Sequence, residues 1–170
     1  MNSYWSDLDR NIEKASTILL STHKNPDGDG LGAELSMYYY LKSLDKDVRI
    51  INITQISQRY YFMDKDDVVE TYSENMNTWI SEVDLVIVFD LGDFNRLGEI
   101  ATQIKENQLF IINVDHHIPK DESVYNISIV DSKAPATTYM CWKYYQFLGM
   151  NDKKLDDKIA YPLYVGLVND

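Results

Sequence analysis

The sequence has 170 residues, a hydrophobic fraction of 45% and a formal net charge of −11. Surfaces that bind nucleic acid are usually basic, because neutralising phosphates supplies much of their affinity, so this charge argues against a long duplex as a partner. A small phosphate ester remains compatible with the charge, since bound cations reverse the local electrostatics of a carboxylate site.

The cysteine content and the apolar stretches indicate the cellular compartment of the protein. Cys141 is the single cysteine and cannot form an intrachain disulfide, which fits a reducing compartment. The polar N-terminal segment does not resemble a signal peptide, and no apolar stretch approaches the ~20 residues of a membrane span. We therefore expect a cytoplasmic protein without a membrane segment.

Helical and strand patterns alternate along the chain. Apolar runs predict strands over residues 17–22, 48–53, 85–90, 109–114 and, at a sheet edge, 126–130. Helical periodicity is found over residues 4–15, 30–43, 91–106, 135–148 and 155–168, whereas residues 56–80 read as irregular with a weak strand near 68–69. This order predicts an α/β fold of one domain over residues 1–170, a doubly wound, mainly parallel sheet with helices on both faces.

The loop HKNPDGDG follows the first predicted strand. His23 lies four residues before Asp27 and can reach the same metal across the loop. Gly28 permits Asp27 and Asp29 to point to different sides of a turn, so that each can serve a different metal. Asn25, which the following proline restricts, is a candidate substrate contact. The same residues are also typical of a plain turn.

Asp90 ends an apolar strand, where a carboxylate has little structural reason to be. It either caps the helix that follows, a role that suits Asp93 better, or bridges two metals. Arg96 is near the same strand end, where its planar guanidinium either binds a phosphate or forms a surface ion pair.

The segment Asp115-His116-His117 follows the strand at 109–114. Adjacent histidines at a strand end cannot both point the same way, so one can bind a metal while the other faces substrate. All three motifs thus lie at carboxyl ends of strands, where doubly wound sheets bind their ligands. Two metals about 3.5–4 Å apart can generate hydroxide and stabilise an in-line displacement at phosphorus.

The ordered set HKNPDGDGLG, FDLGD, DHH and a late Asp170 resembles the DHH-family phosphoesterases, most of all their oligoribonuclease and 3′-phosphoadenosine 5′-phosphate (pAp) phosphatase branch. The resemblance covers nearly the whole chain. It implies one metal held by His23, Asp27 and Asp90, and a second held by Asp29, Asp90, His116 and Asp170. It also implies that His117 contacts the scissile phosphate and that Asp115 orients a histidine. Tyr139 stands where the family usually has an acid, after Thr137 and Thr138.

The resemblance implies a two-metal hydrolase that acts on short oligoribonucleotides or on pAp. The metal is expected to be Mn²⁺, with Mg²⁺ or Co²⁺ as alternatives. Other readings of the same ligands are a cyclic-dinucleotide phosphodiesterase, a RecJ-like single-strand exonuclease, a manganese inorganic pyrophosphatase or a binding module without catalysis. Family members carry a second, substrate-binding domain, so we expect this chain to be the catalytic domain of a longer protein that can form a homodimer. Alone, it should bind metal but turn over substrate poorly.

Overall fold

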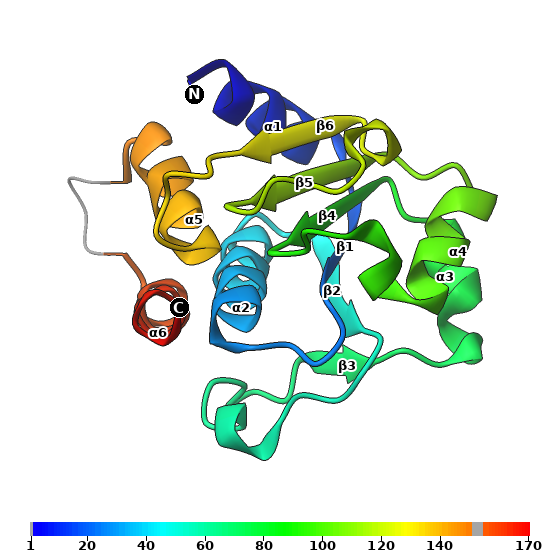
Figure 1. Cartoon of the computed structure of the whole chain (residues 1–170), viewed down its shortest axis with the longest axis horizontal. Helices are drawn as coiled ribbons and strands as arrows, with labels where there is room; N and C mark the ends of the chain where they lie inside the picture. The colour runs from blue at the N-terminus through cyan, green and yellow to red at the C-terminus, as the bar shows by residue number, and fades with distance from the viewer. Residues whose placement is uncertain (1, 151–154) are drawn as a thin grey trace.

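The structure is a computed structural model that describes residues 2–150 and 155–170. Six strands form one sheet in the order β3-β2-β1-β4-β5-β6 (Figure 1). Their bounds are β1 Thr17–Thr22, β2 Asp47–Asn52, β3 Val69–Thr71, β4 Leu85–Phe89, β5 Ile111–Asp115 and β6 Ile127–Val130. Every strand pairing among the described residues is parallel, as predicted.

Helices cover both faces of the sheet. They are α1 Asn2–Lys14, α2 Gly28–Ser43, α3 Asn77–Ser81, α4 Glu99–Glu106, α5 Thr137–Phe147 and α6 Asp157–Asn169. Short 3-10 helices occupy Gln58–Tyr60, Glu74–Met76, Phe94–Leu97 and Glu122–Val124. Helices α1, α2 and α5 share one core cluster with the sheet, whereas α3 and α4 cover the opposite face (Figure 1). The doubly wound α/β prediction is therefore confirmed.

The central strands are buried on both faces, which explains their continuous apolar sequences. In β1, Ile18 and Leu20 face the core beneath α2, and Leu19 between them faces the core beneath α3 and α4. All three side chains are fully buried. A strand with one face exposed to solvent would alternate apolar and polar residues. The continuous apolar sequence of β1 therefore requires a helical layer on each face of the sheet.

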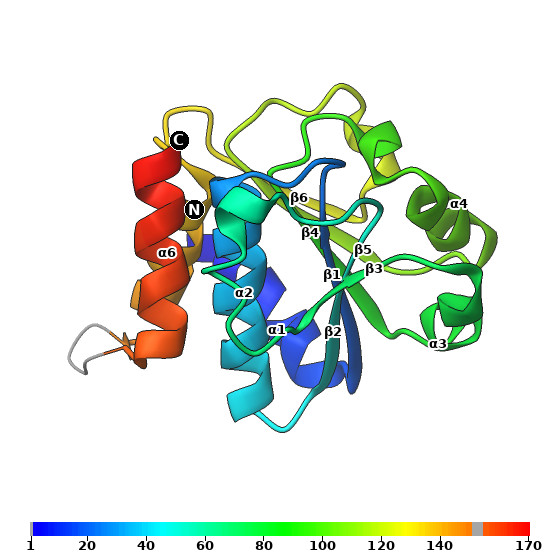
Figure 2. The same ribbon diagram turned by 90° about the horizontal axis from the view of Figure 1, so that it is seen from below.

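Helix α6 runs antiparallel to α2 and lies side by side with it on the outer side (Figure 2). The close approach depends on Gly32, because a Cβ atom there would lie 2.5 Å from the carbonyl oxygen of Pro162 in α6. This packing brings the end of α6 to the same edge of the sheet as the start of α2.

Some predicted boundaries are wrong. The helix expected over residues 91–106 is divided at Gly98, whose φ of 58° a helix cannot accommodate. The segment 56–80 is less irregular than predicted, since it holds two 3-10 helices and most of α3, whose sequence is too brief for a clear period; β3 confirms the weak strand expected near 68–69. The strand expected over 109–114 begins two residues later and ends one residue later, so its last residue is Asp115. The prediction for 155–168 agrees with α6 to within two residues at each end.

The role expected of Gly28 and the backbone conformation expected of Asn25 are also corrected. Gly28 is the first residue of α2 and has no positive φ. Its missing side chain instead leaves room for Asn169, since a Cβ at position 28 would lie 2.7 Å from the Cβ of Asn169. The left-handed turn of the loop occurs at Asn25, with φ 56°, although residues before proline usually favour extended conformations.

Successive strands are added in one direction from β1 to β3 and in the opposite direction from β4 to β6, because β2 and β3 lie on one side of β1 and β4, β5 and β6 on the other. The switch point of the sheet is therefore the crevice between the carboxyl ends of β1 and β4, where doubly wound folds bind their ligands. Among the described helices, none is both long and apolar enough to cross a membrane.

Candidate metal centre

Three ligand-type side chains meet at the switch point. The Nε2 atom of His23 lies 3.5 Å from Oδ2 of Asp27 and 3.8 Å from Oδ2 of Asp90. His23 follows β1, Asp90 follows β4, and Asp27 caps the N-terminus of α2 by accepting from two backbone amides. We call His23, Asp27 and Asp90 the first ligand group.

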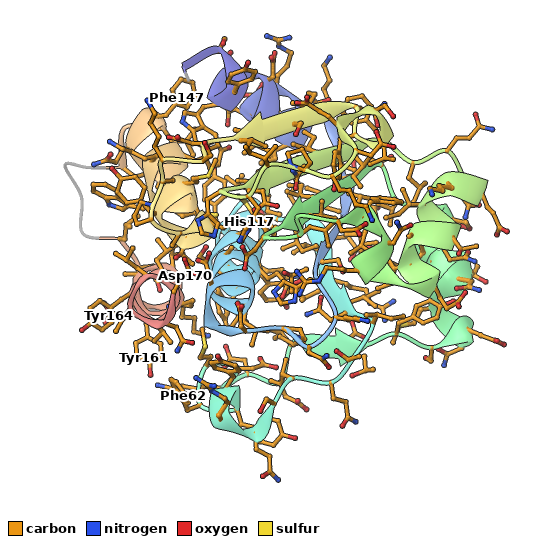
Figure 3. The ribbon with its side chains drawn as sticks, viewed as in Figure 1. Phe62, His117, Phe147, Tyr161, Tyr164 and Asp170 are labelled. Atoms are coloured by element: carbon orange, nitrogen blue, oxygen red, sulfur yellow. The ribbon has the colours of Figure 1, made fainter. Side chains whose placement is uncertain are left out.

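A second group lies on the other side of Asp90. The Nε2 atom of His116 is 3.5 Å from Oδ1 of Asp90, 3.7 Å from Oδ2 of Asp170 and 3.8 Å from Oδ2 of Asp29. Asp170 reaches this point because α6 ends here, as its place in Figure 3 shows. We call Asp29, His116 and Asp170 the second ligand group.

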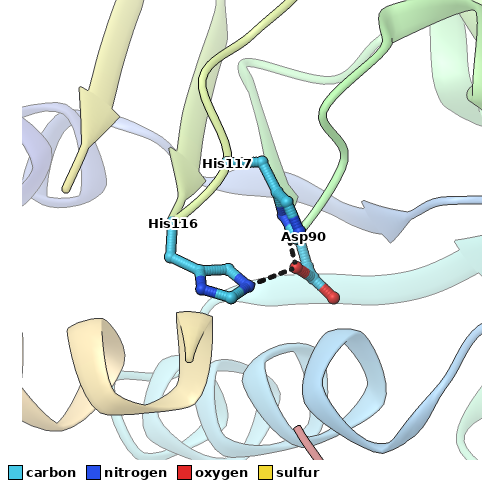
Figure 4. Close-up of side chains that lie close together, drawn as sticks. All are labelled: Asp90, His116 and His117. Atoms are coloured by element: carbon cyan, nitrogen blue, oxygen red, sulfur yellow. Dashed lines mark ion pairs between the residues drawn. The ribbon is translucent and has the colours of Figure 1, made fainter. Parts of the chain in front are cut away.

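Asp90 joins the two groups. Its Oδ2 faces His23, and its Oδ1 faces both histidines of the pair, with Nδ1 of His117 at 3.2 Å (Figure 4). The residue is 2% exposed and has a φ of 53°, in the left-handed region that few residues other than glycine adopt. Helix capping, the alternative role, belongs to Asp93, which accepts from the backbone amide of Asn95.

Asp115 is fully buried and holds His117 in place. One carboxylate oxygen accepts from the backbone amides of Leu91 and Gly92, just after Asp90. The other accepts from the backbone amide of His117 and lies 3.0 Å from its Nδ1. This carboxylate therefore fixes the loop after β4 and the His117 ring together. The side chain of His117 is 53% exposed, unlike that of His116 at 13%.

The N-terminus of α5 supports Asp29 in a way that sequence reasoning missed. Asp29 is 1% exposed, and its carboxylate accepts from the backbone amides of Thr137 and Thr138 at 2.6 and 2.8 Å. The hydroxyl of Thr138 donates to the same carboxylate at 2.7 Å, and that of Thr137 to Asp90 at 3.3 Å. The start of a helix suits an anion, since its amides and its dipole point to it. The two threonines were placed near a helix start, but no local signal tied them to Asp29.

A second support lies beneath the end of β1. The side-chain amide of Asn52 accepts from the backbone amide of Thr22 and donates to the carboxylate of Glu34, each at 3.0 Å. Glu34 is fully buried, and its other oxygen, Oε1, has no hydrogen-bond partner among the described residues. These two side chains anchor the residue that precedes His23, and the sequence offered no signal for either.

The two candidate substrate contacts border the first group. Asn25 is exposed in the loop between His23 and Asp27, and its backbone amide donates to the hydroxyl of Thr54. Arg96 is half-buried in the 3-10 helix after β4, and its guanidinium is near enough to His23 to lower the pKa of that imidazole. The described part of the chain contains no ion pair of Arg96, so the surface ion pair considered above does not form there.

The electrostatics of the centre reflect crowded carboxylates. Burial lowers the pKa of His23, but hydrogen bonds with Asp27 and Asp90 outweigh it and raise the value to about 10. The His23 imidazole in turn lowers the pKa of Asp27 to about 2. Burial and the Asp90 charge raise the pKa of Asp29 to about 6, against the hydrogen bonds from α5. Burial also lowers the pKa of His117, but Asp115 and Asp90 raise it above its usual value.

The donor set fits cations. The Nδ1 atoms of His23 and His116 face the carbonyl oxygens of Lys24 and Ala134, at 2.8 and 3.3 Å. A carbonyl accepts, so Nδ1 donates to it in both rings, and Nε2, which faces the carboxylates, is the atom that would bind a cation in place of a proton. Nε2 of His116 is buried without a hydrogen-bond partner among the described residues. Ligand bonds of about 2.1 Å would place neighbouring ligand atoms roughly 3.0–3.6 Å apart, close to the separations here.

Comparison with known proteins decides the family. The sequence profile of the DHH family, N-terminal domain, matches residues 17–167. The chain belongs to the DHH family. This DHH domain is 27% identical to a probable bifunctional oligoribonuclease and PAP phosphatase NrnA of Streptococcus mutans, over 94% of this chain and 47% of the relative. It is 27% identical to the bifunctional oligoribonuclease and PAP phosphatase NrnA of Bacillus subtilis, over 97% and 49% of the two chains.

Solved structures agree with the fold of this DHH domain. An exopolyphosphatase-related protein from Bacteroides fragilis superposes with a TM-score of 0.89 at 23% identity, over 99% of this chain and 50% of the other. Exonuclease RecJ bound to manganese superposes with a TM-score of 0.57 at 17% identity, over 98% and 42%. The DHH domain spans about half the length of the curated relatives it matches.

Proposed function

We propose that residues 1–170 form the catalytic domain of a two-metal phosphoesterase that hydrolyses short oligoribonucleotides or pAp. The observation that carries the proposal is the pair of ligand groups that lie on either side of Asp90 at the switch point of the sheet. The names of the NrnA relatives support the substrate class. The manganese in the RecJ structure supports Mn²⁺ as the metal.

The first ligand group and the second would each hold one divalent cation, with Asp90 between them. When bound, such cations activate water and neutralise charge on the phosphoryl oxygens. Carboxylates and imidazoles together suit Mn²⁺ or Co²⁺, and the carboxylates alone suit Mg²⁺. His23 and His116 would each bind a cation through Nε2 in place of a proton, because a backbone carbonyl accepts from Nδ1.

His117 would contact the scissile phosphate. Its Nδ1 is engaged by Asp115 and Asp90, and its side chain is half exposed, so Nε2 is the ring atom that can reach a substrate. These two carboxylates raise the pKa of the imidazole, which favours the protonated form that donates to a phosphate oxygen. Asp115 keeps the ring oriented, and Arg96 and Asn25 flank the place where further phosphate or sugar oxygens would lie.

The proposal is tested with RNA of two to five nucleotides and with pAp, in Mn²⁺, Mg²⁺ or Co²⁺ and after chelation. Mn²⁺ binding is measured in parallel by calorimetry. We expect two Mn²⁺ sites and hydrolysis that chelation abolishes. Asp93→Asn, which alters an acid outside both groups, serves as the matched control for Asp90→Asn. The proposal fails if the protein binds no Mn²⁺, or if Asp90→Asn leaves binding and hydrolysis unchanged.

A further inference from the structure

Tyr60 lies in the connection between β2 and β3, outside every motif discussed so far. Its side chain is 5% exposed, and the guanidinium of Arg59 lies 4.7 Å above its ring. The hydroxyl donates to Oδ1 of Asn169 at 2.8 Å, across 109 positions of sequence. A residue of the β2–β3 connection is thus tied to the last turn of α6.

Asn169 has a second contact, with the start of α2. A Cβ atom on Gly28 would lie 2.7 Å from both Cβ and Cγ of Asn169, so this side chain packs directly against the backbone between Asp27 and Asp29. Asn169 is therefore held from two sides, by Tyr60 and by α2. The residue that follows it is Asp170.

Both contacts restrain the backbone from which the Asp170 side chain extends, because Asn169 and Asp170 share a peptide bond. The backbone amide of Asp170 still donates to Gly166 at 3.2 Å, but its side chain is 31% exposed. Within the second ligand group, Asp29 is clamped by the start of α5 and Asp170 depends on the end of α6.

We propose that Tyr60 is a positioning residue for the metal centre. Its hydroxyl holds Asn169 against α2, and this contact keeps the carboxylate of Asp170 beside His116 in the second ligand group. The inference rests on the proposed function, because it concerns the same cations. It assigns a role to the segment between β2 and β3, which the first ligand group does not use.

The ring and the hydroxyl of Tyr60 can be separated by Tyr60→Phe, which keeps the packed ring and removes the donor. Calorimetric titration with Mn²⁺ should show the site of the second ligand group losing affinity by about three- to tenfold, the usual effect of one lost hydrogen bond. The other site should keep its affinity within about twofold, since no hydrogen bond or ion pair among the described residues joins Asn169 to a side chain of the first group. Hydrogen exchange at residues 166–170 should become faster in the same variant.

Two further variants make the test specific. Asn169→Ala should weaken the same site, and the double variant should lose no more than the larger single effect, because both changes break one contact. Tyr61→Phe is the matched control, since this neighbouring tyrosine is 53% exposed and its hydroxyl has no hydrogen bond among the described residues. It should leave both sites unchanged.

Tyr60→Phe that lowers the melting temperature without changing either Mn²⁺ affinity would reduce Tyr60 to a packing residue and overturn the inference. Equal weakening of both sites would overturn it as well, because the contact would not be specific to Asp170. If the unaltered protein binds no Mn²⁺, the proposed function fails and the inference fails with it. If the unaltered protein binds Mn²⁺ at two sites and Tyr60→Phe keeps both affinities, the inference fails but the proposed function stands.

Discussion

The two ligand groups lie on either side of Asp90 but are built differently. The first takes its members from residues 23–90, at the ends of the adjacent strands β1 and β4 and at the cap of α2. The second requires α5 and α6 to pack on α2, and its members extend from Asp29 to Asp170. Backbone pairing fixes the first group, whereas helix packing fixes the second. The cation affinities of the two ligand groups should therefore respond differently to the same kind of substitution.

Asp90→Asn should have the largest effect, because it removes the charge that faces both groups. We expect the affinity for both Mn²⁺ ions to fall by more than about 100-fold, beyond the usual cost of losing a residue that only orients a ligand. Calorimetry measures both sites at once. Retention of one site at its original affinity would show that Asp90 serves a single cation and does not join the two groups.

Asp170→Asn should separate the groups. Only the second group contains this carboxylate, so one Mn²⁺ site should be lost and the other kept within about twofold. Manganese EPR during titration distinguishes two coupled ions from one. Loss of both sites together would mean that the first group does not bind its ion independently.

Gly32→Ala should weaken cation binding by the second group, although it replaces none of the ligand residues. The new Cβ would meet the backbone oxygen of Pro162, so α6 must move away from α2. We expect a destabilisation of about 1–3 kcal/mol, as for other overpacked sites, together with weaker binding at the second group only. Urea denaturation and Mn²⁺ titration measure the two effects. Ala33→Gly alters the neighbouring helix position, also buried, and provides a control for helix propensity.

Glu34→Gln should have the smallest effect, confined to the pH dependence of stability. Burial raises the pKa of Glu34 from 4.5 to about 8. A raised folded-state pKa gives stability that is full below the unfolded value and is lost as pH rises through 8. The wild type should therefore lose stability between pH 4.5 and about pH 8, the window between the two values, more steeply than the variant, whose amide does not titrate.

Denaturant melts across that pH range test the Glu34 prediction, with Glu82→Gln as an exposed control. Glutamine can still accept from Asn52, so Mn²⁺ binding at the first group should persist. Parallel pH profiles for wild type and Glu34→Gln would mean that Glu34 is already ionised in the folded protein.

The sequence was informative where structure is local or repetitive. Continuous apolar strands predicted a parallel sheet with two helical layers, and acids at strand ends predicted the edge at which the ligand residues meet. The division of the 91–106 helix escaped because one residue, Gly98, overrides the period of its neighbours. The short helix α3 gave too few residues to show a period.

The supports of the centre could not be predicted, because they join residues far apart in sequence. Thr138 donates to Asp29 across 109 positions of sequence, and the sequence around neither residue indicates this contact. Asn52 and Glu34 read as an ordinary strand end and helix position until folding buries them together. The ligands were suggested by chemical type and spacing, whereas their orientation depends on contacts that only the tertiary structure creates.

The backbone of Asp90 limits which amino acids that position can hold. A left-handed φ is tolerated mainly by glycine, asparagine and aspartate, because the short side chains of the latter two can hydrogen-bond locally. The role proposed for the position also requires a carboxylate. Glutamate supplies the carboxylate but not the conformation, and asparagine supplies the conformation but not the charge. Of the common amino acids, aspartate alone satisfies both conditions, so a saturation library at position 90 should contain no second active member.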